Sequence, residues 1–259
     1  MRLKGQVAIV TGSASGIGRA IALAFVKEGA AVAIADLNLK GARQTANEIA
    51  AAGGKALAVR ADVTNSSQVR NMVKACLKRF KTIDILVNNA GLQHIAPVVD
   101  LDEAKWNLLM GVHLTGAFLC AKAVLPTMIA KRSGRILNIS SIHGKEASKF
   151  KAPYVAAKHG LIGLTKVLAL ETAEFNITAN AICPGYVRTP LVENQLPMLA
   201  AKHRLTESEV LERVVLKDVP QKRLLEPEEV AQLACYLASS EAIGITGQAI
   251  NISGGWCMH

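Results

Sequence analysis

The chain has few cysteines, and they form no pattern that binds a metal or builds a disulfide framework. There are five, an odd number, and no Cys-x-x-Cys pair occurs. This usage is typical of reduced thiols in a cytoplasmic protein and argues against a disulfide scaffold or a zinc site. No group of His, Asp and Glu has the spacing of a catalytic metal centre. We therefore expect a cytoplasmic protein without a metal.

Long apolar runs, aromatic residues and basic clusters are also scarce. No run of 18 uncharged apolar residues is present, and the N-terminus lacks the apolar region of a signal peptide, so no membrane association is expected. The net charge is +10, but Lys and Arg are spread along the chain and aromatic residues make up only 4%. Platforms for stacking bases would be few, which argues against nucleic-acid binding. The charge is interpreted as a solvated surface that helps to steer anionic ligands.

Short apolar runs alternate with longer amphipathic stretches along the whole chain. Continuously apolar strands are buried on both faces, as in a parallel sheet, and their alternation with helices is typical of a doubly wound fold. We predict an α/β protein with one domain over 1–259, a Rossmann-like parallel sheet and helices on both faces. The charged stretch 186–220 is predicted to form a helical lid at the carboxyl edge of the sheet. The predicted strands lie at 7–12, 31–36, 56–63, 83–91, 134–141, 177–185 and 247–255.

A glycine-rich segment, TGSASGIGRA at 11–20, follows the first apolar run and precedes a predicted helix over 16–29. Its first glycine allows a tight turn, the second lets the backbone approach a pyrophosphate, and the third lets the helix pack on the strand. The N-terminus of that helix supplies unpaired N–H groups and a partial positive charge. We therefore predict a dinucleotide-binding loop made by Gly12, Ser15, Gly16, Ile17 and Gly18.

Asp36, at the end of the second predicted strand, indicates which dinucleotide is bound. A carboxylate at this place can accept hydrogen bonds from both ribose hydroxyls and repels a 2′-phosphate. No basic residue precedes Gly16, where the sequence has Ser15. The sequence therefore favours NAD over NADP. The alternative is that Asp36 only caps the next helix, predicted over 38–52.

Two more strand ends carry residues suited to the same cofactor. Asp62 and Val63 are placed to meet the adenine ring. The segment NNAG, 88–91, ends the fourth predicted strand, and its small residues allow close approach to the cofactor while its Asn side chains tie the loop to neighbouring strands. We expect contacts from Asn89, Ala90 and Gly91, although the same letters also fit a plain turn.

Tyr154 and Lys158 are four residues apart, which places them on one face of a helix. The spacing alone equally fits a surface pair. Together with TGSASGIG, NNAG, Ser141 and ICPGYVRTP (182–190), however, it resembles the short-chain dehydrogenase/reductase family over nearly the whole chain.

That resemblance implies the roles of the catalytic residues. Tyr154 would be the acid and base, Lys158 would lower the tyrosine pKa and bind the nicotinamide ribose, and Ser141 would donate a hydrogen bond to the reacting oxygen. The hydride chemistry would belong to the cofactor. The resemblance also implies that the nicotinamide carboxamide is bound by Pro184, Gly185, Val187 and Thr189.

One position departs from the family pattern. The family usually has an Asn on the helix that follows Trp106, where it binds a water that relays protons to the lysine, and this chain has His113 there. Histidine can both donate and accept, but it is larger and can become charged. His113 is a candidate catalytic residue of the relay; the alternatives are that it displaces the water or that it is only a packed helix residue.

Within the family, the chain resembles the D-3-hydroxybutyrate dehydrogenases, and that group implies a small carboxylate substrate. An ammonium and several neutral donors around one pocket would bind such a group in a charge-assisted way. Tyr186 departs from the Trp that the group tends to have, although it is still a large flat wall. The substrate residues expected by this resemblance are Gln93, Ser141, His143, Lys151, Tyr154, Tyr186, Gln195 and Trp256.

Other functions fit part of the pattern. One is a dehydrogenase of the same family that acts on a polyol, a sugar or a 3-oxoacyl thioester. Another is a protein that binds NAD without turning it over. The resemblance further implies a homotetramer, built through the helices around 100–125 and 154–172 and the C-terminal strand; apolar helices of this kind also fit an intramolecular core.

Overall fold

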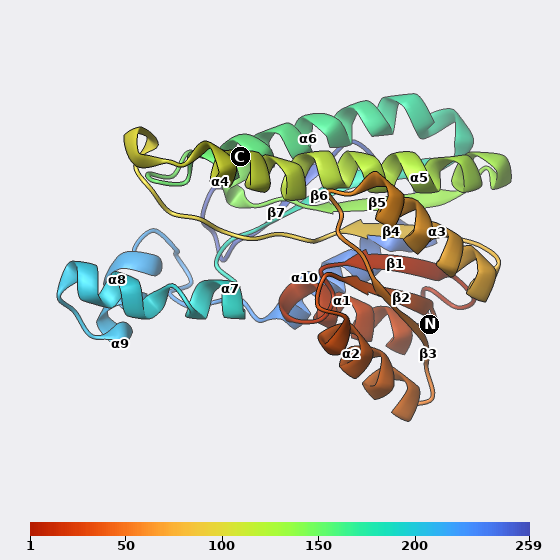
Figure 1. Cartoon of the computed structure of the whole chain (residues 1–259), viewed down its shortest axis with the longest axis horizontal. Helices are drawn as coiled ribbons and strands as arrows, with labels where there is room; N and C mark the ends of the chain where they lie inside the picture. Colours follow the sequence, from red (N-terminus) through yellow and green to blue (C-terminus); the bar gives the residue numbers. More distant parts are fainter.

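The computed structural model describes residues 1–259 and contains one seven-stranded parallel sheet with the order β3-β2-β1-β4-β5-β6-β7 (Figure 1). The order reverses its direction between β1 and β4, as in other doubly wound sheets, so crevices open at the carboxyl ends of these strands. The predicted fold class is confirmed. The strands are β1 (Val7–Thr11), β2 (Ala31–Asp36), β3 (Lys55–Arg60), β4 (Ile85–Asn88), β5 (Gly134–Ile139), β6 (Ile177–Pro184) and β7 (Ala249–Ile252).

Helices cover both faces of the sheet, and each face has its own apolar core. On one face lie α1 (Gly16–Lys27), α2 (Leu39–Ala51) and α10 (Pro227–Ala238), with Phe25 and Ile21 fully buried beneath them. The other face is covered by α3 (Ser66–Phe80), α5 (Gly116–Lys131) and α6 (Ala152–Thr172) (Figure 1). The central strands β1, β4, β5 and β6 are buried along their whole length, which explains why their sequences are mostly apolar.

The helix after β4 is interrupted by a wider turn. α4 (Glu103–Met110) passes into a π-helical turn, η2 (Gly111–Thr115), and continues as α5. Such turns insert one extra residue and are frequent at functional sites. Here the turn contains His113, which is buried.

The composite helix Glu103–Lys131 is long and apolar enough to cross a membrane by length and composition, with a mean hydropathy of 1.7 over its most apolar window. The sequence pattern gave no sign of this, because lysines break the apolar runs. The buried face of α5, which includes Cys120, Val124 and Met128, packs on the sheet as part of the second core. Only 39% of the apolar window is buried, so much of this helix offers apolar side chains to the outside.

Short helices follow β6 in the stretch predicted as a lid. They are α7 (Pro190–Glu193), α8 (Leu196–His203), α9 (Glu207–Val210) and the π turn η5 (Leu211–Val215), and they project from the body of the molecule (Figure 1). They pack around a small apolar cluster of their own that includes Val210, Leu216 and Leu224. The remaining elements are the short helices η1 (Val98–Asp100), η3 (Ile142–Gly144), η4 (Ala173–Phe175) and η6 (Ser240–Ala242).

Candidate active site

A cavity of about 410 Å³ lies at the carboxyl ends of the strands, between the sheet and the lid helices. This edge of a doubly wound sheet is where ligands bind as a rule. The structure brings almost all of the residues predicted from the sequence together there. Those that line the cavity are Gly12, Ser15, Gly16, Ile17, Asp36, Asp62, Val63, Asn89, Ala90, Gly91, Gln93, His113, Ser141, His143, Lys151, Tyr154, Lys158, Pro184, Gly185, Tyr186, Val187, Thr189, Gln195 and Trp256.

Gly18 is the one member of the predicted cofactor loop that does not line the cavity, and its role is in packing. A Cβ at Gly18 would collide with the carbonyl of Gly12, and a Cβ at Gly12 would come within 2.7 Å of the Ala90 Cα. Gly12 and Gly16 both have positive φ values, 62° and 54°, which favour glycine. Gly12 and Gly16 therefore leave the backbone of the loop open at the N-terminus of α1, and this cradle fits a pyrophosphate.

Asp36 is fixed by the backbone around it. Its Oδ2 accepts a 2.9 Å hydrogen bond from the Ala14 N–H, and its Oδ1 accepts one of 2.9 Å from the Asn38 N–H. The cap of α2 is Asn38, whose side chain accepts from the Gly41 N–H, so Asp36 is not the helix cap. The Asp36 carboxylate is thus oriented at the cavity wall with lone pairs available for a ribose.

The loop 88–91 is more than a plain turn, because its Asn side chains bind neighbouring strands. Asn89 Nδ2 donates to the carbonyls of Thr11 and Gly12, at 2.9 Å each, and Asn88 Nδ2 donates to Asn138 Oδ1 at 2.8 Å. These bonds join the loop to the phosphate cradle and to β5. The Asp62 side chain is also held in place, because its carboxylate accepts hydrogen bonds from both the N–H and the hydroxyl of Thr64.

Tyr154 and Lys158 lie on the buried face of α6, and Ser141 faces them from the end of β5. The Lys158 Nζ donates to the Ile139 carbonyl at 2.6 Å and lies 5.4 Å from the centroid of the Tyr154 ring. Burial raises the pKa of Tyr154 to about 12, while the neighbouring Ser141 hydroxyl acts in the opposite direction. Burial lowers the pKa of Lys158 to about 7. Without further charge in the cavity, the phenol is neutral and the lysine is only partly charged near neutral pH.

His113 lies behind this pair. Its ring meets the Tyr154 ring edge-on, with centroids 5.2 Å apart, and its Nε2 is 2.8 Å from the Leu92 carbonyl. Nε2 also lies 3.3 Å from the Leu92 N–H, but the contact with the carbonyl is the shorter one. Because a carbonyl can only accept, this shorter contact favours a proton on Nε2 and leaves Nδ1, which has no protein partner, as an acceptor. Burial and the charge of Lys158 lower the His113 pKa to about 3, so the ring is neutral. A Cβ at Gly91 would be 2.6 Å from its Cε1, so the glycine makes room for the imidazole.

A second group of side chains surrounds the open side of Tyr154. Lys151 Nζ is 3.4 Å from His143 Nε2 and 5.6 Å from the centroid of the Tyr186 ring. Trp256 stacks on Tyr186 at 5.3 Å and meets the His143 ring edge-on at 5.5 Å. Burial lowers the pKa of Lys151, and burial together with the Lys151 charge lowers that of His143 to about 4. The wall therefore combines one cation, one neutral imidazole and two aromatic faces.

The side chains of the two glutamines predicted for this pocket form hydrogen bonds with nearby backbone groups. Gln93 accepts from the His94 N–H through its own side chain, and the Gln195 side chain donates to the Leu191 carbonyl within the lid. The lid also supplies apolar wall residues, Leu191 and Val192, and Leu92 adds another from the loop after β4. These three were not predicted from the sequence, because an isolated aliphatic residue in a loop carries no pattern.

The comparisons with known proteins agree with this geometry. The model of the family described as enoyl-(acyl carrier protein) reductase matches residues 12–257. The oxidoreductase YxjF of Bacillus subtilis, called uncharacterized, is 46% identical over 98% of this chain and 99% of its own length. A D-beta-hydroxybutyrate dehydrogenase of Rhizobium meliloti is 44% identical, over 97% and 98% respectively. The crystal structure of a variant of actinorhodin polyketide ketoreductase with NADPH superimposes with a TM-score of 0.94, at 37% identity and 98% coverage of both chains.

Proposed function

The chain belongs to the short-chain dehydrogenase/reductase family, and from this premise we propose that it oxidises (R)-3-hydroxybutyrate reversibly to acetoacetate with NAD. Membership makes the chain an oxidoreductase with a nicotinamide cofactor. The observation that carries the choice of substrate is the wall opposite Tyr154. There the Lys151 ammonium lies beside His143 and Tyr186, and Trp256 contacts both of these rings, in a space suited to a short chain that ends in a carboxylate.

The proposal of NAD as cofactor depends on Asp36. Its carboxylate is held by two backbone N–H groups at the cavity wall, where it can accept from the two hydroxyls of an adenosine ribose. A 2′-phosphate at the same place would meet a like charge. The structural relative with 37% identity contains NADPH, so this carboxylate is the feature on which a difference in cofactor between the two proteins would depend.

The proposed chemistry assigns one task to each residue. The bound nicotinamide supplies the hydride acceptor or donor. Tyr154 takes the proton of the substrate hydroxyl during oxidation and returns it during reduction. Ser141, whose hydroxyl is close enough to Tyr154 to lower its pKa, binds the same substrate oxygen. Lys158 lies 5.4 Å from the Tyr154 ring, and its ammonium form stabilises the phenolate. The carboxamide is bound at Pro184, Gly185, Val187 and Thr189, all of which line the cavity.

His113 is proposed to orient a water molecule that relays protons behind Lys158. A small cavity of about 10 Å³ is lined by His113, Lys158, Asn88 and Gly116, and this volume is close to that needed for one water. A water there can donate to the bare Nδ1 of His113 and accept from the lysine. Because the pKa of His113 is lowered to about 3, the imidazole orients this water without becoming charged.

The variant His113→Asn is expected to fold and to keep kcat within about tenfold of the parent, since an amide can orient the same water and tenfold lies below the usual contribution of a proton-transfer group. The measurement is the steady-state rate of cofactor reduction, with thermal unfolding as a check on the fold. A hundredfold loss of kcat in a folded His113→Asn protein would show that the imidazole itself is required.

The substrate proposal is tested by giving the purified protein NAD with (R)-3-hydroxybutyrate, (S)-3-hydroxybutyrate, sorbitol and a 3-hydroxyacyl thioester, and following the absorbance of the reduced cofactor. We expect turnover of the (R) acid. In Lys151→Ala, KM for that acid should rise about 10- to 100-fold, because a hydrogen bond to a charged group contributes about 1.5–3 kcal/mol. The matched control is Lys149→Ala, a neighbouring lysine that is exposed. Turnover of sorbitol alone, or equal KM values in both variants, would contradict the proposal.

A 3-oxoacyl thioester is the second candidate substrate. It is favoured by the structural likeness to a polyketide ketoreductase and by the 38% identity with a 3-oxoacyl-[acyl-carrier-protein] reductase of Thermotoga maritima. Such a substrate is neutral near its reacting carbon, so it would gain nothing from the Lys151 charge. The thioester in the panel, measured with the parent and with Lys151→Ala, separates the two candidates.

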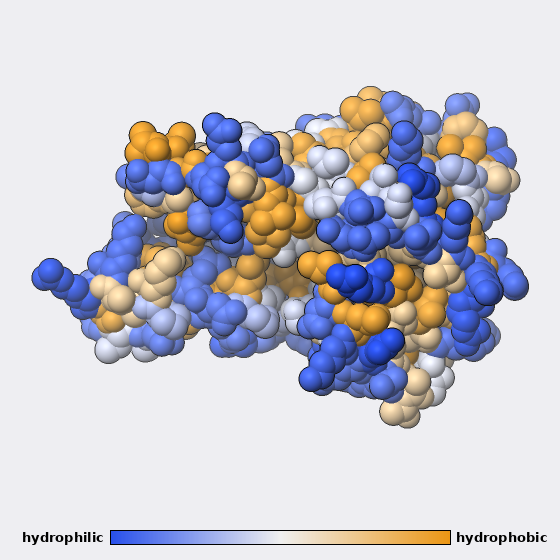
Figure 2. All heavy atoms as spheres, viewed as in Figure 1, coloured by the Kyte–Doolittle hydropathy of each residue, from blue (hydrophilic) through white to orange (hydrophobic).

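We further propose that the protein works in the cytoplasm as a homotetramer. Figure 2 shows apolar groups near α4, with hydrophilic residues over much of α5. Exposed apolar side chains occur on α4, α5 and α6, among them Leu108, Phe118 and Leu170, which is 82% exposed. Such surfaces are usually covered in the working protein. All five cysteines are free, in keeping with a reducing compartment. Light scattering of the purified chain measures its mass, and a monomer would contradict this proposal.

A further inference from the structure

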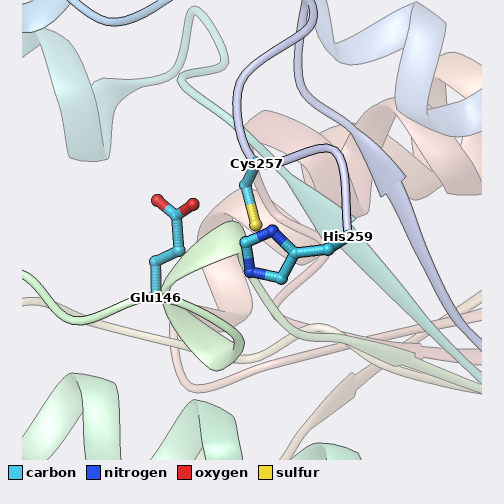
Figure 3. Close-up of side chains that lie close together, drawn as sticks. All are labelled: Glu146, Cys257 and His259. Carbon is cyan, nitrogen blue, oxygen red and sulfur yellow. The ribbon is translucent and has the colours of Figure 1, made fainter.

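Three groups that bind metals converge outside the cavity. The carboxylate of Glu146, the thiol of Cys257 and the imidazole of His259 each offer one ligand atom, and these atoms all lie within 4.8 Å of one another. In Figure 3 the Cys257 sulfur lies next to the His259 ring, with Glu146 beside them. The residues come from distant parts of the chain, one just after η3 and two from the C-terminal tail.

The tail is held in place by bonds to its backbone, which leaves these side chains free. Asn251 Nδ2 donates to the Cys257 carbonyl, and Lys145 Nζ donates to the terminal oxygen of His259 at 2.8 Å. Cys257 has a φ of 56°, in the left-handed region that a residue with a side chain rarely adopts. This turn directs the thiol and the imidazole, which are separated by one residue, toward the same point.

The donor set indicates the class of metal. Thiolate, imidazole and carboxylate together suit Zn²⁺, whereas Mg²⁺ and Ca²⁺ prefer oxygen alone. Cys257 is buried and His259 is exposed, so the site has a sulfur on its inner side and a path from solvent on its outer side. We propose that Glu146, Cys257 and His259 form a Zn²⁺ site with water as the fourth ligand. Binding forms the Zn–S bond as the thiol proton leaves to solvent, and no electron is transferred.

The site would connect the tail to the pocket wall. Trp256 precedes Cys257 directly and contacts His143 and Tyr186. Glu146 lies on the same loop as Ser141 and His143, which is stabilised by the hydrogen bond from the His143 N–H to the Ser141 hydroxyl at 3.1 Å. A metal that joins Glu146 to Cys257 therefore fixes Trp256 against that loop. This inference does not depend on which substrate the pocket accepts.

The test uses the full chain, stripped of metal with a chelator, and titrates it with Co²⁺ as a spectroscopic probe for Zn²⁺. We expect one Co²⁺ per chain, with a thiolate-to-metal charge-transfer band that Zn²⁺ abolishes by displacement. The variants Cys257→Ser, Glu146→Gln and His259→Ala should each weaken binding by about 100-fold or more, beyond the effect usual for residues that only support ligands. His259→Ala changes an exposed terminal residue, so it tests the site even if another variant folds poorly.

Met258→Ala is the matched control, because Met258 lies between two proposed ligands and is 85% exposed. It should bind Co²⁺ as the parent does. The other four cysteines belong to no group of three side chains that could hold a metal, and none of them should give the band. The proposal is overturned if the parent gives no band with stoichiometric Co²⁺, or if the band persists in Cys257→Ser. Because the readout is metal binding, failure here leaves the proposed dehydrogenase activity untouched, and the reverse also holds.

Discussion

Tyr154→Phe is expected to lower kcat by about 10²- to 10⁴-fold, the usual contribution of a group that transfers a proton in the rate-limiting step. The Tyr154 side chain is half-buried at the cavity wall, and this burial raises its pKa to about 12. Water cannot readily replace the lost hydroxyl, because the ring lies between His113, His143 and Lys158. Dissociation of the cofactor, measured by its fluorescence, should change little. The rate is measured as cofactor reduction at saturating substrate.

Tyr236→Phe is the matched control for Tyr154→Phe, since Tyr236 lies on α10 and contributes to the core on the opposite face of the sheet. It removes a phenolic hydroxyl without touching the cavity, and kcat should stay at the parental value. If Tyr154→Phe turned over as fast as this control, the phenol would not be the acid and base, and the mechanism would have to use another group.

The preference for NAD over NADP, taken as the ratio of the two kcat/KM values, should fall by about 100-fold or more in Asp36→Ala. Two effects act in the same direction. NAD loses hydrogen bonds to a charged acceptor, each contributing about 1.5–3 kcal/mol. NADP is relieved of repulsion between the carboxylate and its 2′-phosphate, which at about 4 Å and an effective dielectric constant of about 20 amounts to roughly 4 kcal/mol.

A ratio is the appropriate measurement, because Asp36 also accepts from the backbone of Ala14 and Asn38. Any loosening of the loop would lower kcat/KM for both cofactors, so its effect cancels in the ratio. Asp62→Ala serves as the control, since Asp62 lines the same cavity near a different strand end. A parent protein that already prefers NADP, or an Asp36→Ala protein with an unchanged ratio, would contradict the proposed use of NAD.

The arrangement of the sheet could be predicted from the sequence, because buried parallel strands have a continuous apolar signature. The second strand, 31–36, matches the structure residue for residue, and the other predicted strands overlap the observed ones. The predicted cofactor and substrate residues also meet at one cavity, because strands that run in parallel bring their carboxyl ends to one edge. Gly18 packs against Gly12, as predicted for the third glycine of the loop, but it was also counted among the cofactor-binding residues and does not line the cavity.

Other parts of the site could not be foreseen, for physical reasons. The position of Leu191 and Val192 depends on how the lid packs, and short helices have no strong periodicity. The convergence of Glu146 with Cys257 and His259 depends on the turn at Cys257. Its positive φ cannot be predicted from the fact that the residue is a cysteine. The neutral state of His113 likewise follows from burial, which one residue letter does not reveal.

The π turn at Gly111–Thr115 makes the pocket sensitive to the number of residues in this helix as well as to their identity. A π turn takes up one extra residue within a single wide turn, so the helices on either side keep nearly the facing they would have in a regular helix that is one residue shorter. Deleting one residue between Met110 and Gly116 would therefore restore a regular helix and leave Trp106 and Leu108 on the outer face. The imidazole, which lies in the wide turn itself, would be displaced from the tyrosine. A change in length at this turn can thus alter the chemistry of the pocket and leave the outer surface of the molecule as it is.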